Sequence, residues 1–254
     1  MISYAQNFED VMLNRTFKGV EGGFYIDVGA WHPNTDSVTR HFYESGWSGI
    51  NIEPVRHYHA LLKKKRPRDI NLNLGVADCA KHVMFHEVPG TGISSFSSDV
   101  IDWASRLGYA HRSQEVEVIT LETVCDAHCK GKTVNFLKID AEGMEKEVIQ
   151  GMNWKRYRPI IVLVEAIEPE TQKPAWDAWE PLLLDAEYTF VWFDGINRFY
   201  VRNEDSDLRR YFLVPPNRLD GFFVSNTFAP LCERMNIWLC DCFRRTRNWL
   251  IGKR

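Results

Sequence analysis

The sequence lacks any uninterrupted apolar run of about 20 residues, which is the length that a membrane-spanning helix needs. Its first ten residues (MISYAQNFED) lack the charged start and the apolar stretch that a secretory signal requires. We therefore expect a protein that is made and retained in the cytoplasm, in solution or at most on a membrane surface.

A strong net charge of either sign is also missing. The formal net charge is −3 and the sequence pI is about 6.3, so the chain lacks the broad positive field with which proteins bind phosphate backbones. We therefore expect no nucleic-acid partner. A local basic cluster, residues 63–66 with Arg68, is interpreted as a solvated helix end, with an anionic partner as the alternative.

Cysteine is scarce, with six residues in the chain, and in the cytoplasm these are expected to be reduced thiols. Cys125 and Cys129 flank His128, which suggests zinc, but no second ligand pair follows at zinc-finger spacing. Buried thiols are the preferred interpretation there.

The composition, 44% hydrophobic and 26% charged, is that of an ordinary globular protein, and 254 residues can bury one sizeable core. We expect one main domain over residues 1–224. Residues 225–254 are expected to form a helical extension in which aromatic residues such as Trp238 and Trp249 mix with arginines. Packing on the domain is favoured for this extension, with contact to a membrane surface or a partner protein as the alternative.

Apolar runs and helical patterns alternate along the chain. Residues 24–28 (FYIDV) follow two glycines and end at Gly29, as expected for a buried strand before a functional turn. Strand, helix and strand in that order predict a parallel crossover, and hence an α/β fold with a doubly wound, mostly parallel, Rossmann-like sheet. The other expected elements are helices at 36–44, 57–65 and 144–151, strands at 49–53, 70–74, 81–88, 133–140 and 159–165, and a C-terminal antiparallel hairpin of 188–193 with 198–201.

Carboxylates stand at or near the ends of several of these strands. Glu53, Asp140 and Glu165 each end an apolar strand, and Asp27 lies inside another. Ligands of open parallel sheets bind beyond the carboxyl ends of the strands, so these acids are expected to converge on one crevice.

The turn after the first of these strands indicates which ligand the crevice takes. A dinucleotide site needs several glycines so that the backbone can approach a pyrophosphate, whereas this turn (DVGAWHP) has one. S-adenosylmethionine carries no phosphate, so Gly29 and Ala30 would suffice beside it, with Asp27 holding its ammonium group. A methyl donor is therefore favoured over NAD, and an NAD-dependent nucleotide-sugar oxidoreductase is the alternative enzyme.

Two further acids fit such a donor. Glu53 lies 24 positions after Gly29 (53 − 29), close to the offset of about 20 at which an acid accepts both ribose hydroxyls. Asp78 follows the segment GVA and is expected either to meet the exocyclic amine of adenine or to serve as a turn residue.

Six segments carry a resemblance to a known family: residues 4–10 (YAQNFED), 24–30 (FYIDVGA), 36–39 (DSVT), 46–54 (GWSGINIEP), 136–143 (FLKIDAEG) and 194–200 (DGINRFY). With these segments the chain resembles the FkbM methyltransferase family. The resemblance implies transfer of a methyl group from S-adenosylmethionine to an oxygen, commonly a sugar hydroxyl in a glycan, a lipid-linked saccharide or a glycosylated metabolite. A catalytically inactive donor-binding partner of glycan-assembly enzymes is the alternative from another class.

Methyl transfer to an alcohol calls for close positioning and for a base or metal that lowers the pKa of the hydroxyl. Asp140 is the leading candidate for the base or the oxygen ligand, and Glu142 with Glu165 would assist or bind Mg²⁺. The competing interpretation is that Asp140 and Glu142 cap the next helix. His32, in the turn beside the donor, is a second candidate base, with a structural role as its alternative.

Residues 89–118 are irregular and rich in loop formers, and we expect a lid or an acceptor-binding loop there. His86 precedes this segment and His111 lies within it, and neither has a partner in the sequence. Core packing is the default expectation for Trp31, Trp47 and Trp192, although each could stack on a sugar ring.

Overall fold

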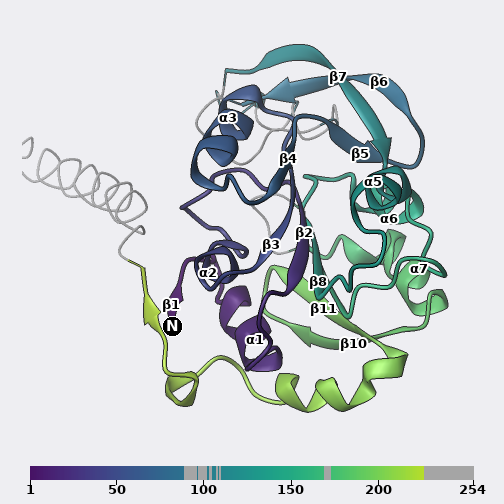
Figure 1. Cartoon of the computed structure of the whole chain (residues 1–254). Coiled ribbons are helices and arrows are strands. Elements are labelled where there is room, and N and C mark those ends of the chain that lie inside the picture. The colour runs from purple at the N-terminus through teal and green to yellow at the C-terminus, as the bar shows by residue number, and fades with distance from the viewer. Residues whose placement is uncertain are drawn as a thin grey trace, which may run out of the picture.

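A computed structural model of the chain describes residues 1–88, 96, 102, 105–106, 108, 110–168 and 173–225. A seven-stranded sheet runs through its middle in the order β10-β11-β9-β8-β2-β3-β4 (Figure 1). All neighbours from β4 to β9 are parallel, and β11 is antiparallel to both of its neighbours. The predicted mixed α/β fold with a mostly parallel sheet and a C-terminal hairpin is confirmed. The strands are β2 (Phe24–Val28), β3 (Ser48–Ile52), β4 (Ile70–Leu72), β8 (Phe136–Ile139), β9 (Ile161–Glu165), β10 (Tyr188–Phe193) and β11 (Asn197–Arg202).

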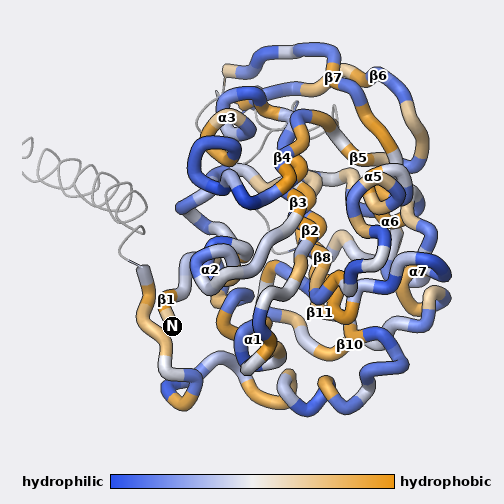
Figure 2. Tube along the Cα trace, in the orientation of Figure 1, coloured by the Kyte–Doolittle hydropathy of each residue, from blue (hydrophilic) through white to orange (hydrophobic). Residues whose placement is uncertain are grey.

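Helices cover both faces of this sheet (Figure 1). Residues of β2 alternate between two cores, since Ile26 and Val28 pack with α5 and α6, and Tyr25 packs with α1 and α2. Figure 2 shows the central strands as the most hydrophobic part of the chain. The helices are α1 (Glu9–Thr16), α2 (Arg40–Glu44) and α3 (Arg56–Lys65) on one side, and α5 (Leu121–His128), α6 (Glu145–Gln150) and α7 (Glu180–Asp185) on the other.

The strand order reverses between β2 and β8. From β2 the chain adds β3 and then β4 toward one edge, and later returns to place β8 and β9 on the opposite side of β2. The segments after β2 and β8 therefore diverge from the same point, and ligands of parallel sheets bind at such a point.

A three-stranded sheet in the order β5-β7-β6 lies at the top of Figure 1. The irregular chain predicted up to residue 118 is wrong over 112–118, because these residues belong to β7, which pairs with β6 along its length. Most of the predicted lid lies outside the described residues. The strands are β5 (Gly75–Ala77), β6 (Lys81–Glu87) and β7 (Arg112–Thr120), and the remaining elements are β1 (Ile2–Ser3), η1 (Trp176–Ala178), η2 (Asn203–Phe212), η3 (Arg218–Asp220) and β12 (Phe223–Val224).

The helix predicted at 36–44 begins only at Arg40. Asp36 has a positive φ of 49°, which a helix does not allow. The Ser37 N–H donates to the carbonyl of Tyr4, and the Thr39 hydroxyl donates to Asp27. Tertiary hydrogen bonds thus replace the first helical turn.

The basic cluster at the end of α3 is only partly solvated. Lys63, Lys64 and Lys65 are exposed as predicted, but Arg66 is 2% exposed. Its guanidinium donates to the Pro33 carbonyl and to the Ser37 hydroxyl at 2.6 and 3.0 Å. Arg66 therefore holds the loop between β2 and α2, and its interpretation as a solvated residue is wrong.

Other predictions concern buried and terminal residues. Cys125 and Cys129 are buried free thiols, and Trp47 lies in the core, as expected. Within the described ranges, no helix is long and apolar enough to cross a bilayer. The predicted C-terminal helical extension lies outside the described residues apart from Ser225.

Candidate active site

Carboxylates meet where the parallel strands end. Asp140 directly follows β8, Glu165 is the last residue of β9, and Glu142 lies two residues beyond Asp140. One carboxylate oxygen from each lies within 4.8 Å of the other two. In the part of the chain that the structure describes, this is the one group of His, Cys, Asp and Glu side chains that could surround a metal ion. Of the four acids expected to converge, Asp140 and Glu165 belong to this group, whereas Asp27 and Glu53 lie outside it.

Burial and the neighbouring acids both change the pKa of Glu165. Burial raises the pKa of the Glu165 carboxyl well above its usual range, and the nearby carboxylates of Asp140 and Glu142 push it in the same direction. A cation placed between the three carboxylates would relieve this repulsion.

Lys138 of β8 lies beside Asp140 and links it to Asp27 of β2. Its ammonium is 3.2 Å from Asp140 Oδ2 and 3.4 Å from Asp27 Oδ1, and it donates to the Gly29 carbonyl at 3.1 Å. Burial alone would lower the pKa of Lys138, but the carboxylates of Asp140 and Asp27 outweigh burial and raise it. One buried cation thus ties the end of β8 to the turn after β2.

Asp27 is almost fully buried, and it is the residue of β2 with which Lys138 pairs. Burial raises its pKa while the Lys138 ammonium opposes the shift, and Oδ2 accepts a hydrogen bond from the Thr39 hydroxyl at 2.9 Å. The contact of Asp27 with the ammonium group of a donor stays a prediction.

Position 29 requires glycine because the residue that follows β8 packs directly against it. Its φ is 73°, and a Cβ at this position would lie 1.8 Å from the carbonyl oxygen of Asp140. The N–H groups of Gly29 and Ala30 both donate to the carbonyl of Ile52 at 3.1 Å. The turn therefore packs directly on Asp140 and directs these two donors at β3.

The loop that carries Glu142 is held by an acid that the sequence analysis missed. Glu145 is buried, and its Oε1 accepts the N–H groups of Ala141 and Gly143 at 3.0 and 3.2 Å. The N-cap residue of α6 is Met144, which makes no side-chain cap hydrogen bond, and Glu145 bonds the loop before the helix instead of capping it. Glu142 has a φ of 50°, a conformation unusual for a non-glycine residue.

Glu53 lies just beyond β3, with its carboxylate turned toward the glycine turn. Oε2 accepts the N–H of Trp31 at 2.8 Å, and Oε1 accepts the N–H of Val55 at 2.7 Å. Burial raises the pKa of Glu53 to about 7 despite these two bonds. Each oxygen keeps a lone pair for a further donor.

His32 is occupied within its own turn. Its Nδ1 accepts the N–H groups of Asn34 and Thr35 at 3.2 and 3.0 Å, which places the proton of the neutral ring on Nε2. Burial lowers the pKa of His32, and the neighbouring His57 adds to the effect. A ring bonded in this way has no free nitrogen lone pair, so the geometry favours the structural role.

The remaining predicted residues are more dispersed. Asp78 lies on the turn between β5 and β6, where it pairs with Lys81 at 3.1 Å, so the turn alternative describes it.

His86 and His111 lie side by side with ring centroids 6.0 Å apart, which the sequence did not suggest. Trp31 contacts the ring of Tyr58 at the glycine turn. Trp192 packs against the core on the α1 side.

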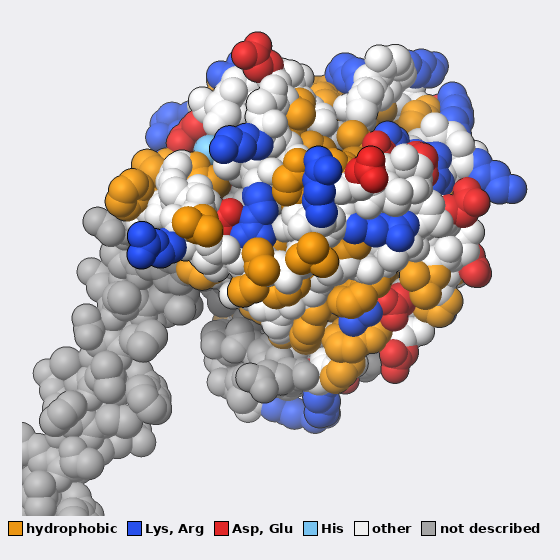
Figure 3. Space-filling view, turned by 90° about the horizontal axis from the view of Figure 1, so that it is seen from below, with side chains coloured by type: hydrophobic (Ala, Val, Ile, Leu, Met, Phe, Trp, Pro, Cys, Tyr) orange, Lys and Arg blue, Asp and Glu red, His pale blue; other side chains and the backbone are white. Residues whose placement is uncertain are grey.

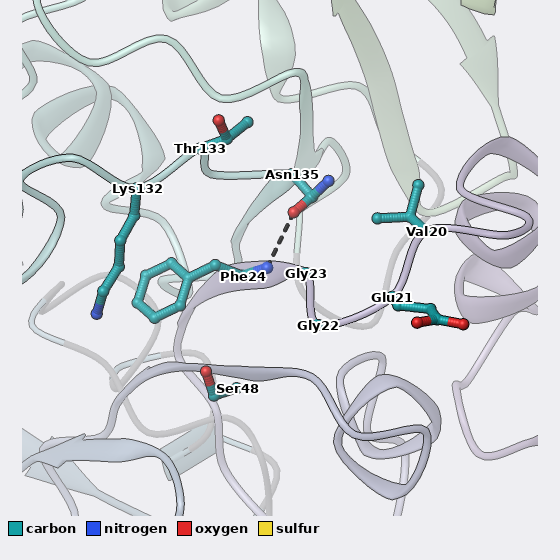
Figure 4. Close-up of a pocket in the computed structure, with 9 residues that line it drawn as sticks. All are labelled: Val20, Glu21, Gly22, Gly23, Phe24, Ser48, Lys132, Thr133 and Asn135. Atoms are coloured by element: carbon teal, nitrogen blue, oxygen red, sulfur yellow. Dashed lines mark hydrogen bonds between the residues drawn. The ribbon is translucent and has the colours of Figure 1, made fainter.

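A shallow cavity of about 420 Å³ opens at the opposite end of the sheet (Figure 4). It lies among the residues that precede β2, β3 and β8, where Asn135 accepts the N–H of Phe24 at 2.9 Å. The side chains lining it bear no cluster of acids. The candidate site is therefore the acidic end of the sheet.

A reversal of strand order, a single-glycine turn and a group of acids define an α/β protein with a candidate ligand site at the carboxyl edge of its sheet. The chain belongs to the methyltransferase FkbM domain family, whose pattern matches residues 27–190. Asp27, Gly29, Glu53, Asp140 and Glu165 all lie within this match.

Two solved structures are similar to the chain. The crystal structure of methyltransferase FkbM from Methylobacillus flagellatus KT has 14% identity and a TM-score of 0.42, over 71% of this chain and 43% of that one. The structure of a TehB-like SAM-dependent methyltransferase from Corynebacterium glutamicum ATCC 13032 Kitasato has 7% identity and a TM-score of 0.40, over 77% of this chain and 88% of that one. The chain thus spans less than half of the FkbM structure that it matches. Comparison with curated proteins finds no match.

Proposed function

We propose that the protein is an S-adenosylmethionine-dependent O-methyltransferase whose acceptor is a sugar hydroxyl of a glycan, a lipid-linked saccharide or a glycosylated metabolite. Family membership supports methyl transfer. The observation that carries the proposal is the packing of the Gly29 turn on Asp140, with Glu53 bonded to the same turn through Trp31. This brings the ends of β2, β3 and β8 to one point.

The turn suits a donor without phosphates. A pyrophosphate site directs backbone N–H groups at the ligand, whereas Gly29 and Ala30 use theirs on the Ile52 carbonyl. This argues against NAD and for S-adenosylmethionine. The two free lone pairs of Glu53 fit the two hydroxyls of a ribose, and the surplus of carboxylates fits a cationic donor.

The side chains at this edge suggest how transfer proceeds. When bound, S-adenosylmethionine supplies an electrophilic methyl group. Asp140, about one-third exposed and anchored by Lys138, would accept the proton of the acceptor hydroxyl, whose oxygen would replace the donor sulfur on the methyl carbon and so release S-adenosylhomocysteine. Lys138 and the Gly29 contact fix Asp140 relative to the turn, so positioning supplies much of the rate.

Donor binding is expected to strengthen as pH rises through 7. Glu53 has a pKa raised to about 7, so below that pH it is protonated and loses acceptor capacity toward the ribose. From pH 6 to pH 8 the Kd for S-adenosylhomocysteine should fall about tenfold, as expected for a single ionisation. Calorimetry of the wild type and Glu53→Gln checks this. An equal pH dependence in both proteins would remove Glu53 from the donor site.

We further propose that Asp140, Glu142 and Glu165 bind Mg²⁺, since hard cations prefer carboxylate oxygens and the three already surround one point. EDTA is expected to reduce methyl transfer and added Mg²⁺ to restore it, while Glu165→Gln should raise the Mg²⁺ concentration needed for half-maximal rate. Full activity in EDTA would contradict the metal site without affecting the donor site.

We also propose that the sheet is doubly wound and that one domain extends over residues 1–224. Strand order reverses at β2 and β8, and helices cover both faces, which supports a doubly wound sheet. β1 pairs with β12, so Ile2 lies beside Phe223, which supports residues 1–224 as one domain.

A further inference from the structure

Exposed apolar side chains gather near the two ends of the described chain. Ten large hydrophobic side chains are exposed among the described residues, and six of them belong to residues 1–2 and 213–224. Leu219, Leu213 and Phe223 stand out, at 88%, 78% and 77% exposure. We call this set the terminal apolar surface: Ile2, Leu213, Val214, Leu219, Phe223 and Val224.

One arginine of α1 holds the segment that carries half of this surface. Arg15 donates to the carbonyls of Tyr211, Val214 and Pro215 at 2.8 to 3.0 Å. It also forms a bidentate pair with Asp220, at 2.7 and 2.6 Å. The backbone is therefore fixed, and Leu213, Val214 and Leu219 are held outward.

A second set of bonds joins the N-terminus to the same surface. Ile2 pairs with Phe223 in the parallel β1–β12 ladder, and the Met1 ammonium donates to the Gly221 carbonyl at 2.8 Å. The six apolar residues thus lie on segments that are tied together across more than 200 positions. Exposed apolar residues on segments joined in this way indicate an interaction site.

The C-terminal part of the sequence is positive although the whole chain is negative. Residues 209–254 hold nine Lys or Arg and three Asp or Glu, a net charge of +6, so residues 1–208 carry −9 of the total −3. Figure 3 shows hydrophobic and basic side chains interspersed on the underside of the molecule. Arg210 and Arg218 are exposed on the segments that bear Leu213 and Leu219.

We propose that the terminal apolar surface docks on an anionic lipid bilayer, with Leu213, Leu219 and Phe223 entering the interface. Apolar side chains beside arginines suit a bilayer, because the apolar groups reach the acyl boundary while the guanidinium groups meet lipid phosphates. The six arginines and lysines of residues 226–254, against two acids, continue the same charge. Charge complementarity thus favours an anionic bilayer over a second copy of this chain, whose C-terminal part carries the same positive charge.

Sedimentation of the full-length protein with phosphatidylcholine vesicles, with and without phosphatidylglycerol, tests the proposal. We expect binding to the phosphatidylglycerol vesicles, weakened by added salt. The double variant Leu219→Ser/Phe223→Ser should lower the partition coefficient about tenfold or more, because both side chains would leave the apolar interface.

Met84→Ser/Leu184→Ser is the matched control, since it removes two apolar side chains that are about half exposed on β6 and α7. It should bind vesicles as the wild type does, and thermal melts should be the same for both double variants. Absence of wild-type binding, or equal binding by both double variants, would overturn the proposal. So would a wild-type dimer in light scattering that Leu219→Ser/Phe223→Ser dissociates without any change in vesicle binding.

Discussion

The variant Asp140→Asn is expected to lose methyl transfer by about 10²–10⁴-fold, the usual contribution of a general base. Asparagine keeps the shape of the side chain but cannot accept the hydroxyl proton. The Kd for S-adenosylhomocysteine should change by no more than about threefold, because the substitution alters only the side chain and leaves the backbone contact with Gly29 in place. Turnover of labelled S-adenosylmethionine with a glycan extract, together with calorimetry, separates the two effects.

His32→Asn is the matched comparison. The Asn side-chain oxygen can replace Nδ1 as the acceptor for the N–H groups of Asn34 and Thr35, so the turn should survive while the imidazole is lost. We expect this variant to keep most of its activity. A large loss of activity in His32→Asn, with little change in Asp140→Asn, would assign the role of the base to His32 in place of Asp140.

Lys138→Met should cause the largest loss of stability. Lys138 is buried against Asp27 and Asp140, and its removal leaves the Asp27 carboxyl buried without its cation. Breaking a buried pair in this way costs about 3–5 kcal/mol. Urea denaturation should show a lower free energy of unfolding, and donor affinity should fall because the Gly29 carbonyl also loses its partner.

The double variant Asp27→Leu/Lys138→Met provides the control. It removes both charges, so it should recover part of the stability that Lys138→Met loses. A loss below about 1 kcal/mol in the single variant, or no recovery in the double variant, would show that the pair is not coupled as the distances suggest.

Much of the sheet could be predicted because its strands are apolar on both faces. β9 is apolar up to Glu165, β2 and β8 each contain one charged residue among apolar ones, and parallel strands bring their carboxyl ends to one edge. Asp140 and Glu165 could therefore be brought together from the sequence alone. The missed strand β7 begins with four polar residues and depends on its pairing with β6, which local patterns do not reveal.

Lys138 and Glu145 could not be assigned, because their roles depend on tertiary contacts. Lys138 is opposite Asp27 in the β2–β8 register, and a lysine inside an apolar strand, two residues before Asp140 and hence on the same face, was the available signal. The role of Arg66 could not be assigned either, because Arg66 follows three lysines that are exposed to solvent.

The most direct test of the donor site is a calorimetric titration of the wild-type protein with S-adenosylhomocysteine at pH 8, repeated with NADH. We expect one molecule of S-adenosylhomocysteine per chain to bind, more weakly in Glu53→Gln, and no binding of NADH. Folded protein that binds NADH, or that binds neither ligand, would contradict a methyl-donor site at the ends of β2, β3 and β8.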